Sequence, residues 1–210
     1  MVAEQLVARG MAHQPVLQAM ATVKRHQFVP AEKLRYAYAD QRFPPGLETP
    51  YVVALVAERI EPKATDRVLE INSGSGYQAA VLGQLVQAVY TVESDKGWAE
   101  SNLQRLGYTN NIFVRCGELG RGWPEAAPFD SIVVNGSIDQ IGPSLVAQLN
   151  AGGRLIIPVA EDNNLHVYLK SSGRLVAFAT WPVRPTPVPG NVIDLPPLQQ
   201  IMPATPITPK

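Results

Sequence analysis

A glycine-rich turn between a strand-like run and a helix-like run is the feature that most constrains the fold of this chain. The apolar run Val68–Ile71 precedes the turn Asn72–Gly76, and the run Tyr77–Leu82 follows it. A strand that feeds such a turn and then a helix directs backbone N–H groups and a positive dipole end to one point. Glycines there permit positive φ and a close approach of a ligand. The sequence therefore predicts a nucleotide-binding type of β–turn–α unit.

An acidic residue follows the next strand-like run. Ala88–Val92 ends in Glu93, about twenty residues past the turn, where a carboxylate accepts hydrogen bonds from a ribose. Together the two signals predict a cofactor that contains adenosine, without saying which one. The plainer alternatives are an ordinary strand–turn–helix connection and a solvated acid at the end of a strand.

Strand-like and helix-like runs alternate from Arg67 onward. Strands are predicted at 67–71, 88–92, 111–116, 130–135 and 153–159, and helices at 76–86, 96–106 and 139–149. This order predicts a mostly parallel sheet with helices on both faces. Two further runs, Leu165–Lys170 and Leu175–Trp181, are joined by Ser171-Ser172-Gly173 and predict an antiparallel hairpin at the end of the sheet.

The segment before the sheet is predicted to be helical. Apolar residues recur at three- and four-residue steps through residues 1–35, whereas residues 36–49 have the composition of a loop. A helix is predicted over Pro50–Ile60, with Pro50 in its first turn and Thr49 as its N-cap.

We expect one domain over residues 1–182, made of a helical part, 1–60, and a sheet, 61–182. Residues 183–210 are expected to form a proline-rich tail, because nine of the nineteen prolines lie between Pro182 and Lys210. That density of proline excludes regular helix and central strand.

Composition narrows the class of protein. The 210 residues are 46% hydrophobic and 17% charged, which is typical of a globular chain. Lys+Arg and Asp+Glu both number 18, so no basic face is implied and nucleic acid is not expected as a partner. No membrane-spanning or secretory run is evident, so no membrane partner is expected and the cytoplasm is the expected location. The oligomeric state stays open.

Metal chemistry is not indicated. The single cysteine, Cys116, excludes an internal disulfide and a cysteine-based metal site, and the three histidines lack ligand spacing. Cys116 is expected to be a small apolar residue of the sheet, and Trp123 a packing residue.

The order of these motifs resembles the protein-L-isoaspartate O-methyltransferase family over about residues 2–182. The matching runs include Met1–Leu6, Arg25–Pro30, Val68–Ile71, Gly74–Leu82, Val89–Glu93, Gly122–Asp130 and Gln148–Val159. The resemblance implies a Rossmann-like α/β fold with a mostly parallel, seven-stranded sheet and an antiparallel end. It also implies S-adenosylmethionine as cofactor, and methyl transfer to an isoaspartyl-like carboxylate of a protein or peptide.

The resemblance further implies the residues of the site. Those expected at the cofactor are Glu70, Asn72, Ser73, Gly74, Ser75, Gly76, Glu93, Ser94, Gly117, Glu118, Leu119 and Asn135. Thr49 is the candidate catalytic residue, as the one hydroxyl near a serine of the family that is absent here. Methyl transfer to an ionised carboxylate needs no general base, so the lack of a catalytic triad does not argue against this function.

The chain departs from the family pattern at the cofactor loop. Asn72 and Ser73 stand where the family has Gly and Thr, and Gly117-Glu118-Leu119 stands where it has Gly-Asp-Gly. Asn tolerates positive φ, so the turn is expected to survive, with a side chain projecting where the cofactor passes.

The connection from Gly46 to Pro50 is also shorter than the Gly-Gln-Thr-Ile/Val-Ser-Gln run of the family. We therefore expect weak or absent isoaspartyl repair. The alternative function is a catalytically impaired relative that serves as a cofactor-binding or protein-interaction module. A nicotinamide oxidoreductase ranks lower, because Tyr77 stands where Gly-x-Gly-x-x-Gly needs a small residue and no second domain is predicted.

Overall fold

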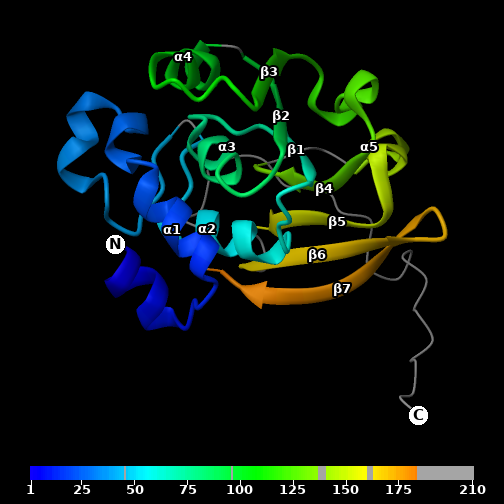
Figure 1. Cartoon of the computed structure of the whole chain (residues 1–210), viewed down its shortest axis with the longest axis horizontal. Coiled ribbons are helices and arrows are strands. Elements are labelled where there is room, and N and C mark those ends of the chain that lie inside the picture. Colours follow the sequence, from blue (N-terminus) through cyan, green and yellow to red (C-terminus); the bar gives the residue numbers. More distant parts are fainter. Residues whose placement is uncertain (45, 96, 137–140, 160–162, 184–210) are drawn as a thin grey trace.

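The computed structural model describes residues 1–44, 46–95, 97–136, 141–159 and 163–183 (Figure 1). Seven strands form one sheet in the order β3-β2-β1-β4-β5-β6-β7. The strands are β1 Arg67–Ile71, β2 Ala88–Glu93, β3 Ile112–Cys116, β4 Phe129–Val134, β5 Leu149–Val159, β6 Asn164–Ser171 and β7 Arg174–Pro182. The helices are α1 Gln14–Thr22, α2 Pro50–Arg59, α3 Tyr77–Leu82, α4 Gly97–Arg105 and α5 Pro143–Gln148.

The direction of the strands confirms the predicted mixed sheet. The pairs among β3, β2, β1, β4 and β5 are parallel, whereas β5–β6 and β6–β7 are antiparallel. The chain proceeds from β1 toward β3 in one direction and from β4 toward β7 in the other. The strand order therefore reverses between β1 and β4, and open α/β sheets bind ligands outside the carboxyl ends of the strands at such a point.

The sheet is covered on both faces, as Figure 1 shows. Helices α1, α2 and α3 contact one another and share one apolar cluster with inward residues such as Val68 and Val89. Leu69 and Ile71 lie in a second cluster together with Leu145 of α5. Both clusters are built from alternate residues of the same strands, which explains why the central strands read as continuous apolar runs.

The amino-terminal segment, predicted to be helical over residues 1–35, consists of several short helical pieces. Short helical turns occupy Val2–Leu6, Val7–Arg9, Arg25–Phe28 and Ala31–Tyr36, and α1 is the one longer helix among them. Gly10 ends the first stretch with a φ of 85°. Val23, with extended backbone, ends α1. The apolar periodicity was thus correct for burial but not for helix continuity.

Two helix bounds differ from prediction. Helix α3 ends at Leu82 rather than at 86, because i+3 turns follow, with Leu85 N donating to Leu82 O at 2.8 Å. Helix α5 ends at Gln148, and Leu149 already pairs with Phe129 as the first residue of β5. The beginning of the predicted helix 139–149 and the tail after Val183 lie outside the described residues.

Candidate active site

The predicted turn Asn72–Gly76 follows β1 directly, at the carboxyl end of the strand. Asn72, Gly74 and Gly76 have φ values of 62°, 65° and 81°. The structure thus places an asparagine in the left-handed region that the residue tolerates better than most side chains do. The glycine-rich turn survives the replacement of its first glycine.

The short connection before α2, taken here as the segment from Arg42 to Glu48, lies against this turn. A Cβ on Gly74 would lie 2.6 Å from Gly46 Cα, and one on Gly46 would lie 2.7 Å from Gly74 Cα. The connection is closed by two hydrogen bonds of 2.9 Å between Phe43 and Leu47. Both contacting positions therefore require glycine, and the backbone of the connection rests on the turn.

An ion pair joins the two ends of the same connection. Arg42 Nε lies 2.9 Å from Glu48 Oε1, and both side chains are largely buried. Burial raises the pKa of the Glu48 carboxyl, and the positive charge of Arg42 opposes that rise. The pair flanks the Phe43–Leu47 bonds and stabilises the closed shape of the connection.

Helix α4 supports the other side of the turn. A Cβ on Gly76 would lie 2.9 Å from Leu103 Cγ, so the absence of a side chain permits close packing. Asn102 Nδ2 donates to Ser75 O at 3.0 Å, and Ser75 Oγ accepts from Tyr77 N at 3.3 Å. Ser75 is fully buried and serves the turn itself.

Glu93 ends β2 next to the turn, as predicted. Its carboxylate accepts hydrogen bonds from Ser73 N at 2.8 Å, Gly74 N at 3.1 Å and Thr91 Oγ1 at 2.6 Å. The side chain is nearly buried, and it fixes the conformation of the turn. Thr91 is a residue that the sequence analysis missed; a hydroxyl two residues before the acid on one strand face was the available signal.

Glu70 and Asn135 meet at the ends of β1 and β4. Asn135 Nδ2 donates to Glu70 Oε1 at 2.8 Å, and Asn72 Nδ2 donates to Asn135 O at 3.2 Å. Burial, then the charge of Glu93, raises the pKa of Glu70 well above its usual range. Glu70 Oε2 and Asn135 Oδ1 are buried and have no hydrogen-bond partner among the described residues.

The remaining predicted residues lie on the same edge of the sheet. Gly117 N donates to Glu93 O at 2.9 Å, which places the end of β3 beside the end of β2. The side chains of Ser94 and Glu118 are exposed. Leu119 is partly buried and packs against the second apolar cluster, so part of its side chain belongs to the core.

Thr49 has the capping role that the sequence predicts. Its Oγ1 accepts from Val52 N at 3.2 Å at the start of α2, and the side chain is buried. A hydroxyl that accepts one bond still has its own proton to donate. The cap therefore leaves a donor at this position, beside the connection that rests on the turn.

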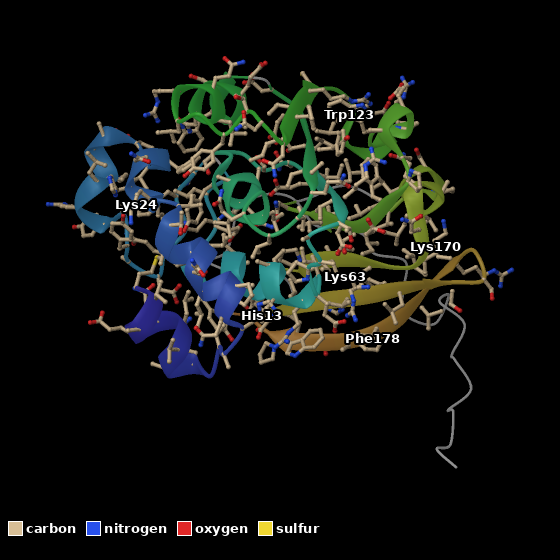
Figure 2. All side chains as sticks on the ribbon, in the orientation of Figure 1. His13, Lys24, Lys63, Trp123, Lys170 and Phe178 are labelled. Carbon is tan, nitrogen blue, oxygen red and sulfur yellow. The ribbon has the colours of Figure 1, made fainter. Side chains whose placement is uncertain are left out.

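Two expectations outside the turn have different outcomes. Trp123 packs edge-on against Tyr90, with ring centroids 5.4 Å apart, which confirms a packing role (Figure 2). Cys116 lies in β3 as expected, but its thiol is exposed rather than buried, and Sγ approaches Ser94 O at 3.4 Å. The edge position of β3 explains the exposure, because only one neighbouring strand covers it.

Arg25 is a structural residue that sequence reasoning missed. Its fully buried guanidinium donates from Nε to Ala37 O at 2.9 Å and lies 5.1 Å from the centre of the Tyr77 ring. Burial lowers the pKa of Arg25 to about 10. The side chain joins residues 37–41 to the start of α3, and the nearby tyrosines were the sequence signal for a cation–π site.

Within the described residues, no cluster of His, Cys, Asp or Glu has the arrangement of a metal site. In the same part of the chain, no helix is long and apolar enough to cross a membrane.

Comparison with known sequences agrees with this geometry. The family model for protein-L-isoaspartate(D-aspartate) O-methyltransferase matches residues 1–191. The chain is 46% identical over 168 residues to a protein-L-isoaspartate O-methyltransferase of Pelotomaculum thermopropionicum, covering 77% of this chain and 73% of the relative. It is 45% identical over 200 residues to one of Gloeobacter violaceus, covering 90% and 96%.

Solved structures share the fold. A protein-L-isoaspartate O-methyltransferase superposes with a TM-score of 0.74 at 25% identity, covering 92% of this chain and 67% of the other. A Plasmodium falciparum protein, described as a complex with S-adenosyl-L-homocysteine, superposes with a TM-score of 0.70 at 23% identity, covering 84% and 91%. The turn, the sheet order and the sequence matches together show that this chain belongs to the protein-L-isoaspartate(D-aspartate) O-methyltransferase family.

Proposed function

We propose that the chain transfers a methyl group from S-adenosylmethionine to an isoaspartyl-type carboxylate of a protein or peptide. The observation that carries the proposal is the buried acceptor set beside the glycine-rich turn, in a chain of this family. Glu70 Oε2 and Asn135 Oδ1 are buried acceptors that no donor of the described residues reaches, and such atoms are costly unless a ligand supplies the missing N–H groups.

The residues of the site fit the cofactor in three ways. An ammonium group offers the donors that Glu70 and Asn135 lack. Glu93 accepts three bonds, and an ionised carboxylate has about four acceptor positions, so capacity remains for a ribose hydroxyl. The turn also lies at the carboxyl end of β1, beside the point where the strand order reverses, although the Cβ side of Gly74 is occupied by Gly46. In this assignment, Ser94 and Gly117–Leu119 border the adenosine end.

Bound S-adenosylmethionine supplies an electrophilic methyl group on a sulfonium. The protein then has to align an ionised carboxylate and exclude water, which are the main contributions to such a displacement. We assign the alignment to the free O–H of Thr49, which would donate to a substrate carboxylate. The connection Arg42–Glu48 would cover the turn.

The proposal also includes the partners and the cellular location of the protein. A zero net charge gives no support for a nucleic-acid partner, and we propose a cytoplasmic protein that acts on polypeptides. We also propose that residues 1–182 form the catalytic domain, with 183–210 as a separate tail.

Calorimetry with S-adenosylmethionine, S-adenosylhomocysteine and NAD tests the cofactor assignment. We expect binding of the first two and none of NAD. Labelled methyl transfer to an isoaspartyl peptide, with the aspartyl isomer as control, tests the substrate. If no adenosyl ligand binds, the protein is a non-catalytic interaction module and the proposed function is wrong.

A further inference from the structure

The backbone N–H groups of residues 72–74, which follow β1, all point to the same side. Asn72 N donates to Val92 O at 2.8 Å, and Ser73 N and Gly74 N donate to Glu93. All three groups therefore face β2. The opposite neighbour, β4, receives no backbone donor from these three residues, although its last ladder bond, from Asn135 N to Ile71 O, measures 2.9 Å.

The side chain of Asn72 takes the place of the missing backbone donor. Asn72 Nδ2 donates to Asn135 O at 3.2 Å and adds one bond beyond the β1–β4 ladder. Asn135 in turn donates from its side chain to Glu70 at 2.8 Å. Two hydrogen bonds of opposite direction thus join the ends of β1 and β4, at the point of the sheet where open α/β folds bind ligands.

The residue after Asn135, which follows β4, is matched to this arrangement. Gly136 has a φ of 72°, and a Cβ there would lie 3.1 Å from Asn72 Nδ2. The space that a side chain at 136 would fill is the space beside the Asn72 amide. A glycine at 72, as in the family pattern, would leave Asn135 O without this donor.

We propose that Asn72 is a positioning residue that holds the end of β4 and so directs Glu70 Oε2 and Asn135 Oδ1 at the amino-acid end of the cofactor. This inference rests on the proposed function, because it assumes an adenosyl amino acid as ligand. It reverses the expectation that the Asn72 side chain obstructs the site, since its amide is engaged with β4.

The test compares two ligands and two variants. S-adenosylhomocysteine has the amino-acid end, whereas 5′-methylthioadenosine lacks it and cannot reach the two acceptors. Asn72→Gly restores the family residue and removes the amide, and Asn72→Asp keeps the size but cannot donate to Asn135 O. In both variants we expect about a ten-fold fall in the preference for S-adenosylhomocysteine over 5′-methylthioadenosine.

Asn111 offers a matched control. Its Nδ2 donates to Gly83 O at 2.9 Å, which is the same kind of bond at the other end of α3. Asn111→Asp should lower the melting temperature in a comparable way but leave the ligand preference unchanged. The control separates a general loss of stability from a loss of positioning.

A double variant tests the route of the effect. If Asn72 acts through Asn135, then Asn72→Gly should change the ligand preference less in an Asn135→Ala background than alone. Wild-type preference in both Asn72 variants, or full additivity in the double variant, would overturn the inference while leaving the proposed function intact. Failure of the wild-type protein to bind either ligand would overturn both.

Discussion

At the scale of single residues, the site is built from carboxylates that the fold buries. Glu93 is engaged by the turn that it was predicted to accompany, and Glu70 is buried with one oxygen that has no partner in the described part of the chain. The hydrogen bond between Glu70 and Asn135 could not be predicted from the sequence, because the two residues are 65 positions apart and meet only through the pairing of β1 with β4. The residue types were predictable, and their mutual bonds were not.

Glu93→Ala should weaken binding of S-adenosylhomocysteine about ten-fold or more, because the ribose loses an acceptor and the turn loses two of its bonds. Calorimetry at 25 °C measures the affinity, and circular dichroism checks that the variant is folded. Unchanged affinity in the folded variant would remove Glu93 from the site.

Glu70→Gln should stabilise the free protein at neutral and alkaline pH. Because the folded pKa of Glu70 is raised, the native state holds a proton that the unfolded chain has released, so wild-type stability falls as pH rises above about 4.5 toward the folded pKa. Glutamine carries no charge and avoids this loss. The wild-type protein and the variant should therefore have the same melting temperature at pH 4. At pH 8 the variant should have the higher melting temperature. A variant that is less stable at pH 8 would show that the carboxylate is charged without penalty.

At the scale of elements, strands β1 to β4 and helix α2 agree with prediction within a residue or two, because apolar runs between glycines and prolines specify them, whereas β5 begins at Leu149 rather than at the predicted 153. The predicted hairpin β6–β7 is confirmed as well. Residues 1–35 are largely helical, as predicted, but Gly10 and the extended backbone at Val23 divide the segment into short pieces while burial continues. Periodicity reports a buried face, and it does not report whether a helix is continuous.

Substitutions of Thr49 can separate its role as the cap of α2 from a role in binding the substrate. Thr49→Asn retains a capping oxygen, whereas Thr49→Ala loses it and should cost about 0.5–2 kcal/mol of stability. If the Thr49 hydroxyl donates to the substrate, Thr49→Asn should keep the melting temperature and lose most methyl transfer, and Thr49→Ser should keep both. Full activity in Thr49→Asn would limit this residue to the helix cap.

The short connection should limit the rate of methyl transfer. A chain in which Gly46–Thr49 is extended to carry the Gly-Gln-Thr-Ile-Ser-Gln run should methylate an isoaspartyl peptide faster, because a longer cover aligns the carboxylate and excludes water better. An insertion of equal length made of Gly and Ser is the control. Equal rates in the wild-type and the restored chain would show that the closed connection suffices.

At the scale of the whole molecule, one physical arrangement accounts for the position of the site. The order of the strands reverses between β1 and β4, and the turn, the short connection and Asn135 all meet at that point. The alternation of strands and helices predicted the sheet and its carboxyl edge. The sequence did not predict that Gly46 would touch Gly74, since that contact depends on the packing of the amino-terminal segment, which Arg25 holds in place.

The most direct test of the central claim is transfer of a labelled methyl group from S-adenosylmethionine to an isoaspartyl peptide. We expect a base-labile methyl ester on the isoaspartyl peptide and none on its aspartyl isomer. The rate should fall toward background in Glu93→Ala. Absence of ester with the wild-type protein at saturating cofactor, or equal labelling of both isomers, would contradict the assignment of this chain as an isoaspartyl carboxyl methyltransferase.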